Sequence, residues 1–223
     1  MLITISGVLA GSALAEVQAL VATLAWRDGA DTAGQVAKAV KHNTQADLSS
    51  RTGARLRDLI RAGITAHPVL QAAAQPRRFS HLLVSKTETG GGYGLHIDNA
   101  FMGHADARMR TDLSFTLFLS EPNDYGGGAL SIEHSGLTQA IKRPAGDLVL
   151  YPSTRLHAVQ AVTRGARVAC VGWIESRVRS AEDRETLFDL ENLRASLAER
   201  HDPQSAEMLT LGKTIANLLR RFS

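Results

Sequence analysis

The sequence predicts a mainly β fold with helices on both sides of the strands. Short runs of alternating or continuous apolar residues, separated by turn signals, fill residues 79–178. Apolar residues at helical spacing occur before this region, in residues 1–78, and after it, in residues 179–223. Many short strands at regular spacing are typical of a β-sandwich or barrel, so we expect one β core that carries the chemistry, with helical regions attached to it.

The N-terminal region is expected to support this core. The run ITISGVL indicates a short strand, and Ser12 can cap the helix that follows it. Residues 27–53 are polar and rich in glycine, alanine and threonine, which indicates an irregular connection. A second helical pattern covers Thr52–Ala74, and Pro68 is expected to interrupt or restart that helix because proline lacks the backbone N–H.

The central region contains the predicted strands. They are FSHLLVSK, YGLHID, LSFTLFLS, ALSIEH, DLVLYP, HAVQAVT and ARVACVGWIES. The turn signals PNDYGGG, RPAGD, YPST and TRGAR separate them. Alternation within LSFTLFLS places Phe115, Leu117 and Leu119 on one face of the sheet.

Two helices are predicted for the C-terminal region. Ser180 followed by Asp183 resembles a capping box in which aspartate replaces the usual glutamate. Two apolar stripes follow, separated by HDPQ. This pattern favours a helical hairpin docked on the β core, and a homodimer interface through the C-terminal helices is the alternative. The basic cluster SRVRS, with Arg184, is interpreted as a solvated face.

Composition excludes several classes of protein. The 223 residues are 44% hydrophobic and 21% charged, as in an ordinary globular protein, and no apolar run approaches the ~18 residues needed to span a bilayer. Cys170 is the only cysteine, which excludes an internal disulfide framework and multi-thiolate metal sites and suits a reducing cytoplasm. The N-terminus lacks the positive region of a signal peptide, so we expect a cytoplasmic location. A net charge of +3 is too weak to indicate nucleic-acid binding by itself.

The stretch YGLHIDNAFMG contains the first candidate site residues. In an extended segment His96 and Asp98 project from the same face, because side chains alternate with period two. Two such groups side by side indicate either a metal site or a buried hydrogen bond. His157, just beyond the strand DLVLYP, is the best third ligand, since antiparallel strands can bring it back to the end of the β core where His96 and Asp98 lie. Two histidines and one carboxylate are the signature of non-haem Fe(II) oxygenases.

Arg167 adds a candidate anion site. On its strand it shares a face with Ala169, Val171 and Trp173, which is otherwise apolar and is expected to point into the core. A buried arginine needs an anion, and a guanidinium can bind a carboxylate through two parallel hydrogen bonds. A dicarboxylate that chelates iron at one end and meets Arg167 at the other would satisfy both sites, and 2-oxoglutarate has that shape.

These residues and the blocks around them resemble the PKHD-type hydroxylases, which are relatives of the prolyl 4-hydroxylase catalytic domain. The matching blocks are YGLHIDNAFMG, RTDLSFTLFLSEPNDYGGGALSIE, PAGDLVLYPSTRLHAVQAVTRGARVACVGWIES and RETLFDLENL. The resemblance implies a double-stranded β-helix (jelly-roll) core. It implies that His96, Asp98 and His157 bind iron and that Arg167 binds 2-oxoglutarate. It also implies O2 as cosubstrate, an L-ascorbate requirement and, for some members, a link to iron uptake.

Several positions near this site have alternative roles. Many relatives carry a tyrosine on the strand before the first iron-binding histidine, and Thr87 stands there in this chain. Tyr93 is a candidate for the pocket mouth, with packing as the alternative. Asn99 could face the substrate or stabilise a turn. Arg110 and Asp112 are interpreted as an ion pair that supports a strand.

Three functions remain as alternatives from the sequence. The first is a 2-oxoglutarate-dependent hydroxylase acting on a peptide, an amino acid or an iron-chelating small molecule. The second is a non-catalytic, metal-bound jelly-roll that binds a ligand or senses iron. The third is a nucleic-acid demethylase, which the low aromatic content of 5% disfavours. A second HxD spacing, His104 and Asp106, falls in an expected loop and is a weaker metal candidate.

Overall fold

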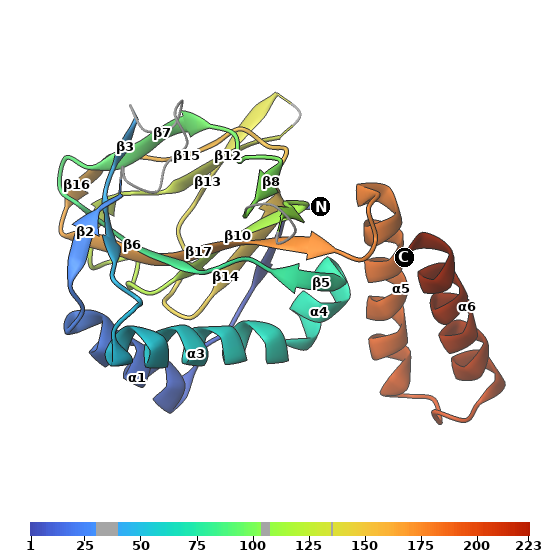
Figure 1. Ribbon diagram of the computed structural model, residues 1–223. Coiled ribbons are helices and arrows are strands. Elements are labelled where there is room, and N and C mark those ends of the chain that lie inside the picture. The colour runs from blue at the N-terminus through green and yellow to red at the C-terminus, as the bar shows by residue number, and fades with distance from the viewer. Residues whose placement is uncertain (30–39, 104–107, 135) are drawn as a thin grey trace.

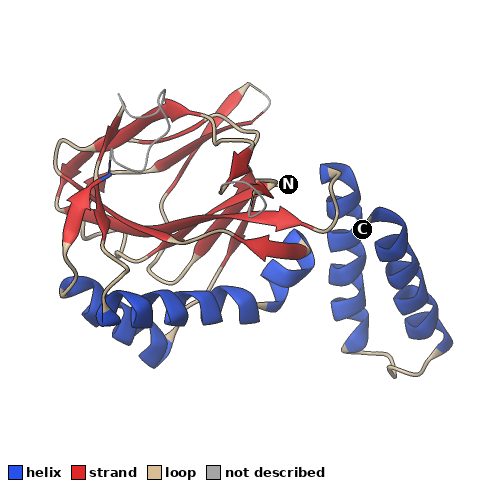
Figure 2. Cartoon of the chain, in the orientation of Figure 1, coloured by secondary structure: helices blue, strands red, loops and turns tan. Residues whose placement is uncertain are grey.

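The computed structural model describes residues 1–29, 40–103, 108–134 and 136–223. Two β-sheets face one another, helices cover the outer side of one sheet, and a helical hairpin follows the last strand (Figure 1). Figure 2 shows the same division between the strand-rich body and its helices. The predicted mainly β class and the jelly-roll core are confirmed. The second candidate HxD pair, His104 and Asp106, lies outside the described residues.

The larger of the two sheets, here called the major sheet, has the order β1-β14-β10-β17-β6-β4-β2, and β5 pairs with β17. Its strands are β1 (Ile3–Ile5), β2 (Trp26–Asp28), β4 (Thr44–Ala46), β5 (Pro76–Phe79), β6 (Leu83–Glu88), β10 (Leu113–Phe118), β14 (Leu148–Pro152) and β17 (Ala166–Ser176). The neighbouring strands pair antiparallel throughout. Strand β17 is central and the longest, so it connects the site region to the C-terminal helices.

The smaller sheet, here called the minor sheet, has the order β13-β12-β15-β7-β3. Its strands are β3 (Lys41–His42), β7 (Gly92–His96), β12 (Leu130–His134), β13 (Leu137–Ile141) and β15 (His157–Val159). Two short ribbons complete the described strands: β8 (Phe101–Met102) with β9 (Met109–Arg110), and β11 (Gly126–Gly127) with β16 (Val162–Arg164). Gly90 has φ of +86° in the turn that carries the chain from β6 to β7, a conformation that favours glycine.

Alternation along β10 explains why the major sheet lies between two different layers. Phe115 and Leu117 pack into a large apolar cluster with the N-terminal helices, and Leu119 belongs to the same cluster, as predicted. Phe118 instead packs with Leu130 of the minor sheet. One face of the strand therefore holds the helices, and the other faces the minor sheet across the space that contains the site.

Three helices form the N-terminal layer. They are α1 (Gly11–Ala22), α3 (Arg51–Ala66) and α4 (Pro68–Ala74), and Figure 1 shows α1 and α3 along the outer face of the major sheet. The buried side of α3 places Leu56, Ile60 and Ile64 at helical spacing against the sheet. Pro68 is the first residue of α4, so the predicted restart at this proline is confirmed.

Two local predictions in this region are wrong. Ser12 does not cap α1, because the helix already begins at Gly11 and Ala10 is the N-cap residue, without a side-chain cap. Residues 27–53 are not simply an irregular connection. Among their described residues are most of β2, all of β3 and β4, and the start of α3. These strands are only two or three residues long and are mainly polar. They form because they pair with other strands, and no alternation of apolar residues in the sequence indicates them.

The C-terminal hairpin consists of α5 (Ala181–Ala198) and α6 (Ala206–Phe222). Ser180 Oγ accepts a hydrogen bond from the backbone N–H of Asp183 at 3.0 Å, which is the predicted cap. Val178, Leu187 and Ile215 form a small core of their own, separate from the core under the major sheet. In the described chain, no helix has both the length and the apolar character that a membrane span requires.

Arg184 corrects the interpretation of the basic cluster. Its side chain is buried, and its guanidinium donates to the carbonyl oxygens of Val178 at 2.7 Å and of Arg179 at 3.0 Å. Those carbonyls belong to the connection between β17 and α5, where no strand or helix partner is available. Arg184 therefore stabilises the junction of the body and the hairpin and is not part of a solvated face.

Candidate active site

The fold brings the three predicted metal ligands together. His96 is the last residue of β7, Asp98 follows two residues later, and His157 opens β15. His96 and His157 are register partners on these neighbouring strands. One ligand atom from each of the three residues lies within 4.8 Å of the others, and the His157 Nε2–Asp98 Oδ2 distance is 3.6 Å. We call these three residues the triad.

Hydrogen bonds orient both imidazoles in the same way. The Nδ1 atom of His96 lies 2.7 Å from the Gly94 carbonyl oxygen, and that of His157 lies 2.9 Å from the Arg155 carbonyl oxygen. With each Nδ1–H donated to the backbone, each Nε2 keeps a lone pair for a metal ion. Burial, and then the nearby His157, lowers the pKa of His96 to about 4, so its ring is neutral at pH 7. A neutral imidazole is the form that binds a metal.

The ring of each histidine in the triad packs against the ring of a tyrosine. The ring of Tyr93 stacks on that of His96, with centroids 3.6 Å apart and an interplanar angle of 17°. The ring of Tyr151 meets that of His157 edge-on, with centroids 5.1 Å apart. Burial, and then the charge of Asp98, raises the pKa of Tyr93 to about 12, so its hydroxyl stays protonated. Tyr93 thus packs on a candidate ligand, which combines the two roles considered from the sequence.

Asp98 is oriented from the opposite sheet. Ser114 on β10 donates a hydrogen bond to Asp98 Oδ2 at 2.6 Å, and the Ser114 and Ser153 hydroxyl oxygens are 2.7 Å apart. Sequence reasoning missed both serines. One signal was available: Ser114 is a polar residue, with Thr116, on the face of β10 opposite the apolar residues Phe115 and Leu117.

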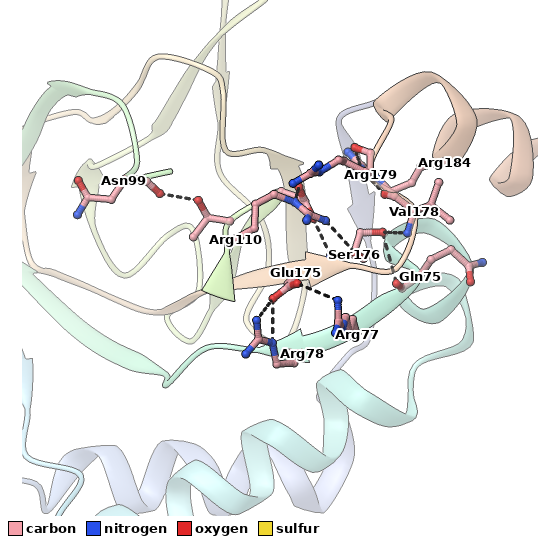
Figure 3. A network of polar contacts seen from close by, with 12 residues as sticks. Gln75, Arg77, Arg78, Asn99, Arg110, Glu175, Ser176, Val178, Arg179 and Arg184 are labelled. Carbon is pink, nitrogen blue, oxygen red and sulfur yellow. Dashed lines mark hydrogen bonds and ion pairs between the residues drawn. The ribbon is translucent and has the colours of Figure 1, made fainter. Parts of the chain in front are cut away.

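The loop after Asp98 is fastened to the start of β10. Asn99 is exposed, and its carbonyl oxygen accepts a hydrogen bond from the hydroxyl of Thr111. Arg110 and Asp112 form the predicted ion pair at 2.6 Å, and Asp112 also accepts from the backbone N–H of Ser176. Figure 3 shows these contacts continuing from Asn99 through Arg110 to the end of β17. The position of Asn99 fits the turn-stabilising alternative through its backbone.

Arg167 lies in the same pocket as the triad, as the sequence predicted. It is only 2% exposed and is the register partner of Thr87, which also lines the pocket. Its guanidinium lies 5.4 Å from the centroid of the Phe118 ring, and its Nε is buried without a hydrogen-bond partner among the described residues. Burial lowers the pKa of Arg167, and neighbouring Tyr125 opposes that shift. Within the described ranges no carboxylate forms an ion pair with Arg167, so the cation suits an anionic ligand.

The pocket that joins these groups lies between the two sheets. It encloses about 610 Å³, counting its open mouth. A wall that the sequence did not predict comes from the segment that includes β3 and β4. Lys41, Asn43 and Gln45 alternate along this segment, and all three line the pocket. The Asn43 Oδ1 and Trp173 Nε1 atoms in the same lining are buried without hydrogen-bond partners in the described structure.

Comparisons with known proteins agree with this geometry. The model of the 2OG-Fe(II) oxygenase superfamily matches residues 64–175. A PKHD-type hydroxylase of Hyphomonas neptunium is 51% identical over 222 residues, covering 100% of this chain and 99% of the relative. A PKHD-type hydroxylase of Synechococcus elongatus is 46% identical over 223 residues, covering 100% of both chains.

A solved structure shows the same fold. It is a prolyl hydroxylase of Trichoplax adhaerens in complex with a peptide fragment of the hypoxia inducible factor oxygen degradation domain. Its TM-score is 0.56 at 18% sequence identity, covering 83% of this chain and 86% of that chain. The family model and the full-length relatives together establish that the chain belongs to the 2OG-Fe(II) oxygenase superfamily, among the PKHD-type hydroxylases.

Proposed function

We propose that the protein is an Fe(II)- and 2-oxoglutarate-dependent hydroxylase in which His96, Asp98 and His157 bind the iron. We assign the far carboxylate of 2-oxoglutarate to Arg167. One observation carries this proposal: three suitable ligand atoms lie within 4.8 Å of one another in a pocket that a buried arginine also lines. The two oriented imidazoles and one carboxylate are the donor set that suits non-haem Fe(II).

The residues of the chain have distinct roles in this chemistry. When bound, iron and 2-oxoglutarate supply the oxidising power for hydroxylation of a C–H bond by O2, with succinate and carbon dioxide as coproducts. His96 and His157 hold the metal through Nε2, and Asp98 contributes one negative charge. Arg167 binds a carboxylate through parallel N–H donors and fixes the orientation of the cosubstrate. Tyr93 and Tyr151 exclude water from one side of the imidazoles.

The substrate is proposed to be a peptide, an amino acid or an iron-chelating small molecule. The structural neighbour from Trichoplax adhaerens binds a peptide, which supports the first class. Lys41, Asn43 and Gln45 give the pocket a polar wall, which favours a substrate with hydrogen-bonding groups beside the C–H bond. A link to iron homeostasis and an L-ascorbate requirement rest on the family resemblance.

The setting of the protein is part of the same proposal. A cytoplasmic location is supported by the presence of a single cysteine, Cys170, in the sequence. We assign residues 79–178 to the oxygenase core, residues 1–78 to a supporting region and residues 179–223 to a helical extension.

The helical extension could also supply a homodimer interface, since Leu193 and Leu209 are exposed there. Nucleic acid is not among the proposed partners.

The test is substrate-free turnover of 2-oxoglutarate. Aerobic protein loaded with Fe(II) is expected to release succinate slowly, and Asp98→Ala is expected to abolish the release. Arg167→Ala is expected to raise the 2-oxoglutarate concentration that the release requires, and Arg164→Ala is its matched control, because Arg164 is an exposed arginine close to Arg167 in the sequence. Succinate release that Asp98→Ala leaves unchanged would contradict the proposed metal site. A well-folded, iron-loaded protein that releases no succinate would favour the non-catalytic binding or iron-sensing alternative.

A further inference from the structure

Two buried hydroxyl groups stand behind the carboxylate of Asp98. Ser114 is 2% exposed and Ser153 is 4% exposed. The Ser114 hydroxyl donates to Asp98 Oδ2 at 2.6 Å, and the two serine oxygens are 2.7 Å apart. Distances this short are typical of O–H···O bonds that end on a charged acceptor. The three groups therefore form one continuous chain of hydrogen bonds.

The direction of these hydrogen bonds follows from the number of hydroxyl protons that the three side chains can donate. An aspartate that binds a metal is ionised and only accepts hydrogen bonds. The single hydroxyl proton of Ser114 is donated to Asp98, so Ser114 can only accept from Ser153. The order is therefore Ser153 to Ser114 to Asp98. Ser153 acts on the carboxylate only through Ser114.

Asp98 needs this support more than the two histidines do. His96 and His157 are fixed by their places in paired strands and by their backbone hydrogen bonds. Asp98 follows the end of β7 and lies in no described strand. Ser114 belongs to β10, and Ser153 directly follows β14, which pairs with β10 in the major sheet. The two serines thus connect Asp98, which follows a strand of the minor sheet, to β10 and to the end of β14 in the major sheet.

We propose that Ser114 and Ser153 are positioning residues for Asp98. They hold the carboxylate in the orientation that places Oδ2 3.6 Å from His157 Nε2, before any metal is bound. The three donor groups are then already arranged when the metal ion binds, so that binding does not have to order the Asp98 carboxylate. This inference rests on the proposed metal site.

The test measures the affinity of the full-length apo-protein for Co(II), by calorimetry and by the visible spectrum of the bound ion. Ser114→Ala is expected to weaken Co(II) binding by about 10–100-fold, the usual range for loss of a partner that orients a metal ligand. Ser153→Ala is expected to have a smaller effect in the same direction. Ser114→Thr, which keeps the hydroxyl, is expected to bind better than Ser114→Ala.

A double variant separates positioning from general destabilisation. Because Ser153 acts through Ser114, the Ser114→Ala/Ser153→Ala protein is expected to bind Co(II) no more weakly than Ser114→Ala alone. Ser85→Ala is the matched control, since Ser85 is a buried serine of the same pocket whose hydroxyl donates to the Ala169 carbonyl oxygen. Its Co(II) affinity is expected to equal that of the wild type.

The outcomes distinguish this inference from the proposal beneath it. If Ser114→Ala binds Co(II) within twofold of the wild type while Asp98→Ala loses binding, the metal site stands and the positioning role is wrong. Additive losses in the double variant would also overturn it. If Asp98→Ala binds as tightly as the wild type, the proposed metal site itself is wrong. Should Ser114→Ala fail to fold, Ser153→Ala compared with Ser85→Ala decides the question.

Discussion

The two faces of the major sheet differ although the same strands form them. The face toward the helices is apolar, with Leu117, Leu148 and Cys170 in one cluster. The face toward the minor sheet carries buried polar residues, among them Ser114, Thr116 and Arg167. Buried polar groups cost free energy unless they are paired, and Arg167 Nε has no hydrogen-bond partner among the described residues, so a fold selected for stability alone would not place this arginine there. The difference separates residues that hold the fold together from residues that prepare the site.

The largest expected effect concerns the helix-facing side. Leu117→Ala removes a fully buried side chain and is expected to lower the free energy of unfolding by about 3 kcal/mol. Chemical denaturation followed by circular dichroism measures this change. The affinity of the folded variant for 2-oxoglutarate is expected to stay within about threefold of the wild type. A large loss of affinity in folded Leu117→Ala would show that the two faces are not separable.

The next effect concerns the site-facing side. Arg167→Met is expected to weaken 2-oxoglutarate binding by about 30-fold, equivalent to about 2 kcal/mol, because the carboxylate loses its charged partner. The apo-protein is expected to keep or gain stability, since Arg167 is buried without a carboxylate partner among the described residues. Calorimetric titration and thermal unfolding test the two parts. Strong destabilisation with unchanged binding would assign Arg167 to the structural side of the comparison.

A smaller effect is the pH dependence of the apo-protein. The pKa of His96 is lowered to about 4 in the folded chain, compared with about 6.5 in an unfolded one. Between these values the unfolded chain binds more protons, so stability falls as the pH decreases from 6.5 toward 4. The loss is expected to be about 1–2 kcal/mol after allowance for partial solvent exposure, and His96→Gln is expected to reduce it. Denaturation curves at several pH values measure this, and identical slopes in both proteins would contradict it.

The smallest effect is expected at Cys170, on the apolar face. Burial raises the pKa of its thiol to about 12, so the thiol is protonated and unreactive in the folded protein. Cys170→Ala is expected to cost about 1 kcal/mol of stability and to leave metal binding unchanged. Labelling with a thiol reagent is expected only under unfolding conditions. Rapid labelling of the native protein would show that this face is open.

The sequence predicted the chemistry of the site better than its supports. Spacing in the sequence indicated His96 and Asp98, and the position of His157 and the apolar face around Arg167 indicated the other two residues. The fold brings all four into the same pocket. The Ser114–Ser153 contact could not be predicted, because it depends on the register between two strands. The same limit applied to Lys41, whose two-residue strand is defined by its pairing with β7.

The local errors have equally specific causes. Ser12 resembles a cap, but the helix begins before it, at Gly11. Arg184 resembles a surface cation, but it is needed to satisfy two carbonyl groups at the junction between β17 and α5. Charge and polarity in the sequence predict the usual environment of a residue type. A connection between two elements, where backbone carbonyl groups lack partners, can bury a residue that is usually exposed.

The central claim is that the triad and Arg167 form one site for Fe(II) and 2-oxoglutarate. The most direct measurement is anaerobic titration of the apo-protein with Fe(II) and then 2-oxoglutarate, followed by visible spectroscopy for the weak metal-to-ligand charge-transfer band. We expect the band in the wild type and in Arg164→Ala, no band in Asp98→Ala, and a higher 2-oxoglutarate requirement in Arg167→Ala. Folded, iron-loaded wild-type protein that shows no band at saturating 2-oxoglutarate would contradict the claim.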